Sequence, residues 1–382
     1  MAPMLKFQKM TITALLLTTA LFTSSAFALK IDLKQVDPNQ FTDLDGLDGL
    51  AALAGFEEAA AFWESTFTDD VTLNFDISFA ALPADVLGST GTNSSVFFYE
   101  NVALGMTNDI SSAEDLTSVN NIACDRFQGG EFTAPGPCAI SFLDSEVDVL
   151  GATTTELDND GSNDNYFLGL TQANAKALGF TADDFGNVFG NSADANITFS
   201  SDFAFDFDRT DGITANEFDF IGIAIHEIGH ALGFTSGVDT YDSHNDSGIN
   251  NLDNFAVNNT LDLFKFSSDS LIVGAGVLDL RPGANTYFSI DGGLTAIAPF
   301  STGRLGGDGQ QASHWKDNQG LGALDPTVSN GEFVLVSELD LLAFDVIGWD
   351  LAVVDVPEPG VLILLLTSTV ILVRRRKNYA FE

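Results

Sequence analysis

Alternating apolar and polar positions mark two strands in the first half of the chain. In VTLNFDISF, residues 71–79, every second residue is hydrophobic, and ADANITFSSDFAFDF, residues 193–207, repeats the pattern. This period of two is typical of strands that bury one face. Two further segments, 48–66 and 171–178, are rich in helix-forming residues and predict helices, the second ending at Gly179. Together these elements predict an α+β domain.

A third helix is predicted over residues 214–234, TANEFDFIGIAIHEIGHALGF. Thr214 and Glu217 have the spacing of a capping box, and Gly233 marks the end, because glycine readily adopts the torsions of a helix C-terminus. Apolar residues three and four apart form one stripe that would face the core: Phe218, Ile221, Ile225, Ile228 and Leu232. A last helix is predicted to begin after Ser337 and to close the domain.

The composition allows a large folded domain behind an export signal. The chain has 382 residues, 45% of them hydrophobic and 33 of them phenylalanine, which suffices for a sizeable core. The first 28 residues have the form of a signal peptide: Lys6 and Lys9 precede an apolar stretch, and Ala26-Phe27-Ala28 ends it as a cleavage site. We therefore expect export and one domain over residues 29–355.

The charge of the chain excludes one class of partner. There are 54 acidic and 15 basic residues, which gives a net charge of −39. Such a surface repels nucleic acid and anionic lipid, so no nucleic-acid partner is expected. The simplest role of the acidity is a solvated exterior that tolerates salt or calcium.

The chain contains two cysteines, Cys124 and Cys138. The segment between them is rich in turn-forming residues, as in a surface loop. An exported chain enters an oxidising compartment, so we expect these two residues to form a disulfide.

The C-terminal segment, residues 356–382, differs from the rest of the chain. Pro-Glu-Pro is followed by 13 mostly apolar residues and then by three arginines and a lysine. The apolar run is short for a free-standing membrane span, and the basic cluster predicts a cytoplasmic end. In this order the three parts resemble the PEP-CTERM sorting tail of Gram-negative bacteria. The resemblance implies transient membrane contact, cleavage by an exosortase-type enzyme, and attachment at or release from the cell surface.

His226, Glu227 and His230 form an H-E-x-x-H motif within the third predicted helix. Two imidazoles four residues apart lie on one helical face and can bind one zinc ion. Glu227 can then take a proton from a zinc-activated water and pass it to a leaving amine. The chain has only four histidines, and two of them have this spacing. The motif therefore predicts zinc-dependent hydrolysis.

A catalytic zinc ion usually has three protein ligands and one open position, so a third ligand is required. The extended signature H-E-x-x-H-x-x-G-x-x-H matches through Gly233 and then places Ser236, a poor zinc ligand, at its last position. Two candidates are open: Asp239, which lies three residues too late, and His314. Ligand chemistry favours His314, because imidazole is a better partner for zinc than a displaced carboxylate. We also expect a carboxylate to accept the other ring N–H of a ligand histidine.

The segment HEIGHALGF, residues 226–234, followed much later by SHW around His314, resembles the leishmanolysin-type metzincins. The resemblance covers residues 190–350. It implies His314 as the third zinc ligand and a zincin-like fold, with a twisted mixed sheet, an active-site helix and a C-terminal subdomain flanking a cleft. In that family a methionine turn lies below the zinc, and here Leu324 occupies that position. Leucine fills a similar volume, so this departure leaves the zinc chemistry intact.

Acidic residues also gather in two polar segments that could hold a second metal ion. Asp158, Asp160 and Asp164 surround a turn at Gly161. Clustered carboxylates can bind calcium, which prefers several oxygen ligands, but an ordinary Asn/Asp/Gly turn explains the pattern equally well. A weaker pattern of the same kind contains Asp242, Asp246 and Asp253. Zinc is therefore the expected cofactor, and calcium stays open beside it.

These observations predict an exported zinc endopeptidase that acts on proteins or peptides. Glu227 would be the general base, with His226, His230 and His314 as metal ligands. An extended substrate would pair with an exposed edge strand, for which residues 196–207 are the candidate. The alternative is a non-catalytic surface or matrix protein on the same scaffold, which the acidic exterior and the tail fit equally well. The presence of Glu227 favours the enzyme, because a degenerate scaffold needs no base there.

Overall fold

The computed structural model describes residues 28–42, 48–122, 127–128, 131–132, 138–147, 153–182, 189, 192–247 and 252–352. Residues 1–27 of the signal segment, the sorting tail and Cys124 lie outside these ranges. Cys138 is part of a disulfide. Among the described residues, no helix has both the length and the apolar character needed to cross a membrane.

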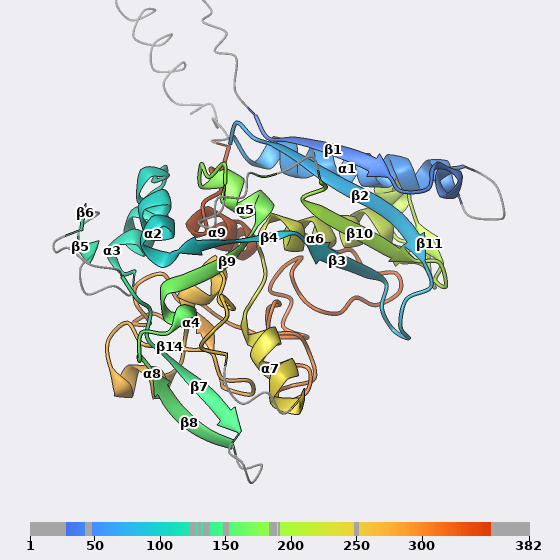
Figure 1. Ribbon diagram of the computed structural model, residues 1–382. Helices are drawn as coiled ribbons and strands as arrows, with labels where there is room; N and C mark the ends of the chain where they lie inside the picture. The colour runs from blue at the N-terminus through green and yellow to red at the C-terminus, as the bar shows by residue number, and fades with distance from the viewer. Residues whose placement is uncertain are drawn as a thin grey trace, which may run out of the picture.

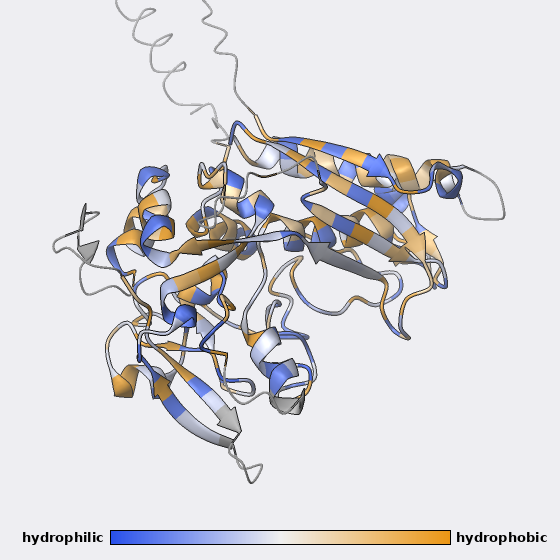
Figure 2. Ribbon diagram, in the orientation of Figure 1, coloured by the Kyte–Doolittle hydropathy of each residue, from blue (hydrophilic) through white to orange (hydrophobic). Residues whose placement is uncertain are grey.

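The largest sheet has four strands in the order β1 (Lys30–Gln35), β2 (Thr72–Ala80), β10 (Ala195–Ser200) and β3 (Gly88–Thr92). The first three strands are parallel, and β3 runs antiparallel to β10 (Figure 1). The predicted strand over 71–79 is confirmed. Hydrophobic and polar positions alternate along β2 and β10 as the sequence pattern indicates (Figure 2).

The predicted edge strand over residues 196–207 is wrong in two respects. The strand ends at Ser200, and Phe205–Asp206 forms a separate short strand, β11, which pairs with β12 (Phe218–Asp219). In addition, β10 is central, because it pairs with β2 on one side and β3 on the other. Alternation shows which face of a strand is buried, but it carries no information about the order of strands. Within the described sheet, the edge next to β10 is β3.

Two helices, α1 (Gly49–Thr66) and α6 (Phe220–Leu232), pack against each other and the sheet. The buried ring of Phe56 in α1 lies 5.1 Å from the rings of both Phe199 in β10 and Phe220 in α6. Edge-to-face contacts of this kind add to the hydrophobic energy of burying three large side chains. The indole N–H of Trp63 donates to the carbonyl oxygen of Ile225 over 3.1 Å, which fixes the rotation of α6 relative to α1.

The start of α6 differs from the predicted capping box. Thr214 and Glu217 belong to a turn, and the N-cap is Asp219, whose side chain accepts from the N–H of Gly222 over 3.0 Å. Asp219 is fully buried and also forms a salt bridge with Arg209 over 2.8 Å. Pairing of β12 with β11 keeps the chain extended up to Asp219, so this long-range contact overrides the local capping signal. The predicted end is confirmed, because Gly233 has a φ of 122°.

The remaining elements are short. The strands are β4 (Ser94–Phe98) with β9 (Phe167–Thr171); β8 (Thr153–Asp158), β7 (Phe142–Val147) and β14 (Leu278–Asp279); β13 (Lys265–Phe266), β15 (Tyr287–Phe288) and β16 (Ala298–Pro299); and β5 (Phe127–Gln128) with β6 (Glu131–Phe132). The helices are α2 (Tyr99–Asn108), α3 (Ala113–Asn120), α4 (Asn163–Tyr166), α5 (Gln172–Ala177), α7 (Val238–Ser247), α8 (Ser268–Val273) and α9 (Glu338–Val346). The 3-10 turns are Pro38–Phe41, Arg209–Asp211 and Thr260–Phe264.

The predicted helices at 48–66, 171–178 and after Ser337 are all present as α1, α5 and α9. Ser337 accepts from the N–H of Asp340, as a capping residue does. Beyond α9, the indole N–H of Trp349 donates to the carbonyl oxygen of Leu232 over 2.9 Å. The C-terminal helix is thereby joined to the end of α6. The mixture of a small sheet, short ladders and packed helices confirms the α+β class.

Several acids cluster where α2 ends near the segment after α9. Burial, followed by the charges of Asp350, Asp69, Asp115 and Asp345, raises the pKa of Asp109 to about 9. The pKa values of Asp69 and Asp345 are each raised to about 7, first by burial. A carboxyl whose pKa is raised on folding stabilises the fold below its unfolded pKa, near 3.8, and this contribution is lost as pH rises through the folded value.

Replacing Asp109 with Asn should therefore stabilise the protein increasingly between pH 4 and pH 9. The neutral amide removes a charge that its acidic neighbours repel. The measurement is Tm across this pH range for wild type and Asp109→Asn, with the exposed Asp211→Asn as a matched control. A difference in Tm that stays constant with pH would contradict the assignment.

Candidate metal centre

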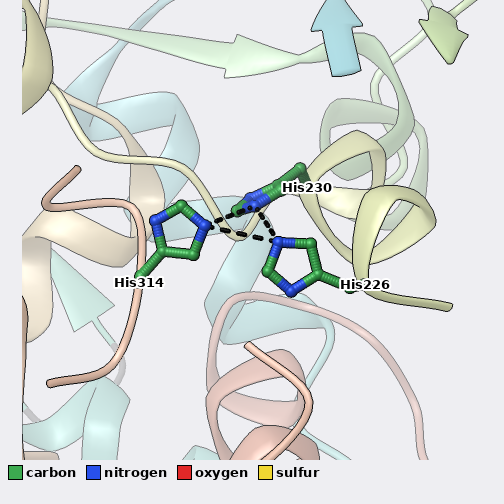
Figure 3. Close-up of side chains that lie close together, drawn as sticks. All are labelled: His226, His230 and His314. Carbon is green, nitrogen blue, oxygen red and sulfur yellow. Dashed lines mark hydrogen bonds between the residues drawn. The ribbon is translucent and has the colours of Figure 1, made fainter. Parts of the chain in front are cut away.

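Three histidine rings converge beside α6. His226 and His230 lie one turn apart on this helix, and His314 enters from the segment after β16 (Figure 3). That segment is held by a bridge between Phe300 and Trp315 and by the N–H of Ser301, which donates to the carbonyl oxygen of His314 over 3.0 Å. The three Nε2 atoms lie 3.0, 3.1 and 3.3 Å from one another.

The other ring nitrogens determine the protonation of these histidines. Nδ1 lies 2.7 Å from the carbonyl oxygen of Ala323 in His226 and 2.7 Å from that of Phe234 in His230. Nδ1 of His314 lies 3.2 Å from the carbonyl oxygen of Gln311. A carbonyl oxygen can only accept, so each Nδ1 carries a hydrogen, and a ring in its neutral form then presents a lone pair at Nε2. The contacts among the Nε2 atoms therefore join three acceptors, which repel one another unless a cation lies between them.

This arrangement fits a zinc ion. Nitrogens about 2.0–2.1 Å from a tetrahedral zinc lie about 3.3 Å apart, close to the separations of the Nε2 atoms. Burial lowers the pKa of His230 to about 3 and that of His314 well below its ordinary value, with nearby His226 contributing to both. Both rings are thus neutral at pH 7, the state in which imidazole binds metals.

Glu227 lies between α6 and the edge strand β3. Its side chain is 5% exposed, and Oε2 accepts from the hydroxyl of Thr90 over 2.7 Å. Burial raises the pKa of Glu227, while His226 and the Thr90 hydrogen bond lower it. The carboxylate is therefore fixed in position next to the histidines and has an increased affinity for a proton.

Gly88 in β3 allows this position of Glu227. A Cβ atom at Gly88 would lie 2.6 Å from Oε1 of Glu227, well inside van der Waals contact. The strand approaches the carboxylate this closely only because residue 88 has no side chain. Sequence reasoning missed both Gly88 and Thr90, since nothing local to GSTGT indicates that it lies beside the motif helix.

The segment containing Leu324 forms the floor of the site. Leu324 is fully buried, and its methyl groups face Gly229, which lies between the two helix histidines. The N–H groups of Ala323 and Leu324 both donate to Asp340 at the start of α9, over 2.8 and 3.3 Å. Asp340 also accepts from the indole N–H of Trp315 over 2.8 Å. The buried carboxylate of Asp340 thus joins the segment that contains Leu324 to Trp315, the residue after His314.

Asp239, the alternative third ligand, has a different role in the structure. It lies in the first turn of α7, and its carboxylate accepts from the N–H of Ala312 over 2.6 Å, the N–H of Ser313 over 3.1 Å and the Ser313 hydroxyl. Its oxygens are therefore committed to the segment that leads into His314. Among the described residues, the side chains whose ligand atoms converge at this place are the three histidines. Asp239 does not belong to this group.

Ser236, at the last position of the extended signature, also contacts this segment. Its N–H donates to the hydroxyl of Ser313 over 3.0 Å, and its own hydroxyl donates to Asp262 over 2.6 Å. Below them, buried Lys265 donates to the carbonyl oxygen of Ala312 over 2.9 Å. Burial lowers the pKa of Lys265 to about 8, and Asp262 and Asp239 oppose that change.

The expectation that a carboxylate would accept a ligand-ring N–H is wrong for the described residues. All three Nδ1 groups contact backbone carbonyls instead. The carboxylates act indirectly. Asp340 binds the N–H of Ala323, whose carbonyl oxygen contacts His226, and Asp239 binds the N–H of Ala312, which follows the residue that contacts His314. Every residue has a backbone carbonyl, so the sequence does not show which carbonyl accepts from a ring N–H. It indicates only that each ligand histidine needs an acceptor.

A pocket of about 350 Å³ opens beside the turn that follows α6. Its polar lining includes Thr92, Ser94, Thr235, Ser236 and His244. The three converging histidines and Glu227 do not line it, so the pocket adjoins the site without containing its chemistry. His244 itself lies outside the histidine cluster, and its Nδ1 is 2.9 Å from the carbonyl oxygen of Thr240.

The two predicted acidic clusters are rearranged. Asp158 and Asp164 do converge, but the third member is Asp253 rather than Asp160. Asp242 instead accepts from the N–H groups of residues 305 and 306 over 2.7 and 2.6 Å. The side chain of Asp246 lies outside the described residues.

A comparison with protein-family models, curated proteins and solved structures finds no match for this chain. The functional assignment therefore rests on the residues and geometry of the site.

Metal analysis distinguishes the ligand from the residue that holds its segment. His314→Ala should no longer hold one zinc ion per chain under conditions that saturate wild type, because one of three ligands is lost. Asp239→Asn should still bind one zinc ion per chain at saturation, with affinity reduced about tenfold, since it only loosens the segment before His314. His244→Ala is the matched control and should bind zinc normally. Complete loss of zinc in Asp239→Asn together with retention in His314→Ala would reverse the assignment.

Proposed function

We propose that this protein is an exported zinc endopeptidase with a zincin-like catalytic domain. The observation that supports it most is the convergence of three neutral Nε2 lone pairs next to a buried carboxylate from the same helix. Three imidazoles and an adjacent glutamate are the side chains that zinc-dependent peptide hydrolysis requires. Structural zinc sites usually have four protein ligands, so a set of three favours a catalytic role.

The mechanism assigns one task to each side chain. Zinc held by the three histidines would polarise the scissile carbonyl and acidify a water molecule beside it. Glu227 would accept a water proton at Oε1, because its Oε2 already accepts from the Thr90 hydroxyl. The raised pKa of Glu227 allows it to keep this proton and then donate it to the amine nitrogen of the leaving group. The Nδ1–H bonds to Ala323, Phe234 and Gln311 keep the three rings oriented meanwhile.

The edge strand β3 is the proposed binding surface for an extended substrate. Its residues Gly88–Thr92 pair with β10 on one side only within the described sheet, and Thr90 and Gly88 contact Glu227. A peptide that adds as a further strand would use backbone hydrogen bonds and would lie beside the catalytic carboxylate. This assignment replaces the strand proposed from the sequence and explains why the edge is composed of glycine, serine and threonine, which leave room for a second chain.

Two further features support the zincin-like proposal. Leu324 lies beneath the helix between the two motif histidines, where the metzincin resemblance implies the methionine turn. The sheet also has one antiparallel strand, at the edge beside the motif helix. By the resemblance of its two ends to a signal peptide and a PEP-CTERM tail, the enzyme would be exported in a Gram-negative cell and processed by an exosortase.

Removing the general base should abolish catalysis without removing the metal. Glu227→Ala should lower kcat/KM on casein or gelatin by about 10²–10⁴-fold, while zinc content and Tm stay close to wild type. Wild-type activity should stop with a chelator and return with added zinc. If zinc-loaded wild type cleaves none of a varied set of proteins, or if Glu227→Ala cleaves as well as wild type, the protein is a binding scaffold instead.

A Cβ atom at residue 88 should separate metal binding from catalysis. Gly88→Ala should push Oε1 of Glu227 from its place and lower kcat/KM at least tenfold, because the added atom would come within 2.6 Å of it. Zinc affinity should stay unchanged, since the three atoms nearest to the added Cβ atom all belong to Glu227. Gly91→Ala, where a Cβ atom meets nothing within 4 Å, is the matched control on the same strand. Equal activities of the two variants would contradict the proposed position of Glu227.

A further inference from the structure

Three carboxylates from separate parts of the chain meet outside the zinc site. Asp158 ends β8, Asp164 lies in α4, and Asp253 precedes the 3-10 turn Thr260–Phe264. One oxygen of each lies within 4.8 Å of the others. Asp164 is only 2% exposed, so at least one of these charges is removed from water.

Among the described residues, no basic group offsets the charge of Asp164. Burial raises the pKa of Asp164 to about 7, and Asp158, Asp253 and Asp160 raise it further by repulsion. Its hydrogen-bond donor is the neutral hydroxyl of Ser162. Asp158 likewise accepts from the neutral amide of Asn165 and has a raised pKa, chiefly through burial. Ionised together, such acids need a cation in their midst.

A buried neutral oxygen on a residue bonded to Asp164 lacks a partner, which indicates that a ligand belongs there. Asn258 is fully buried, and its amide nitrogen donates to the backbone carbonyl of Asp164 over 3.0 Å. Its Oδ1 atom has no hydrogen-bond partner among the described residues. Tyr241 lies in reach of the same charges, because Asp164 and Asp158 both raise its pKa in addition to burial. Buried oxygens left without partners are costly unless an ion or water binds them.

We propose that Asp158, Asp164 and Asp253 bind a calcium ion, with Asn258 Oδ1 beside them as a further oxygen donor. An all-oxygen set of acids and an amide matches the hard cations, whereas zinc prefers nitrogen and sulfur. Calcium accepts irregular coordination by six to eight oxygens, some from water. Magnesium demands a stricter octahedral arrangement and keeps more of its water, so it suits this partly buried site less well.

The ion would fasten one wall of the pocket beside the zinc site. The backbone carbonyl of Asp253 already accepts from the N–H of Asn163 over 2.7 Å, and the Asn163 side chain donates to the carbonyl of Asn254 over 3.3 Å. The residues on either side of Asp253 and Asn254 form the apolar side of the pocket: Leu252, Phe255, Ala256 and Val257. Calcium would neutralise the repulsion between Asp253 and the other two acids. It would thereby hold the segment that contains Asp253 against α4.

The test uses the full zinc-loaded protein freed of calcium, titrated with CaCl2, MgCl2 and terbium. At tenfold excess over its dissociation constant, calcium should raise Tm by about 2–4 °C, and magnesium at the same concentration should raise it less. Terbium should show tyrosine-sensitised luminescence that calcium displaces, since Tyr241 lies within reach of the site and Tyr166 adjoins Gly161. Neither readout depends on zinc or on proteolysis.

Two variants make the site-specific claim testable. Asp164→Asn should bind calcium at least tenfold more weakly. In calcium-free buffer it should be at least as stable as wild type, because it removes a buried charge, so a folding defect would not be mistaken for loss of binding. Asp160→Asn, an exposed acid in the same turn, should respond to calcium like wild type. Equal responses to calcium and magnesium, or an Asp164→Asn protein that responds like wild type, would overturn the proposal. So would stabilisation by mild acid with none by calcium, which would mean that the carboxyls share a proton.

Discussion

Three imidazole lone pairs held 3.0–3.3 Å apart set the main requirement on this fold. Such an arrangement is unfavourable without a cation, so the surrounding chain must prevent the rings from rotating away. Three backbone carbonyls do this by accepting the Nδ1 hydrogens of His226, His230 and His314. The carbonyls belong to three different segments, and each segment is held by contacts of its own. The precision of the site is therefore a property of the loops around α6 as much as of the helix.

Buried carboxylates hold these loops in place. Asp340 binds the backbone of Ala323 and Leu324, Asp239 binds that of Ala312 and Ser313, and Asp242 binds residues 305 and 306. In a region with few ladder hydrogen bonds, a carboxylate that accepts several N–H groups performs the task that a neighbouring strand performs in a sheet. The strongly acidic composition thus has an internal function in addition to its effect on the surface.

Glu227 depends on the opposite side of α6. The helix turns its histidines towards the floor that contains Leu324, and it turns Glu227 towards β3, where Thr90 and Gly88 receive it. In the proposed mechanism, metal binding and proton transfer would therefore rely on separate supports, one from the C-terminal loops and one from the sheet. The aromatic contacts of Phe56 with Phe199 and Phe220 keep α6 at a fixed height above that sheet.

The sequence by itself determined what depends on short spacings. The period of two along 71–79, the four-residue separation of His226 and His230, and the stop at Gly233 all follow from backbone geometry within one element. His314 was within reach only through its residue type and a family resemblance. The tertiary structure decided the rest: that Asp239 holds a loop, that β3 and not β10 is the edge, that α6 begins at Asp219, and that Asp253 joins Asp158 and Asp164. These outcomes depend on which distant segments pack together. The periodicity of residues within one element does not determine that packing.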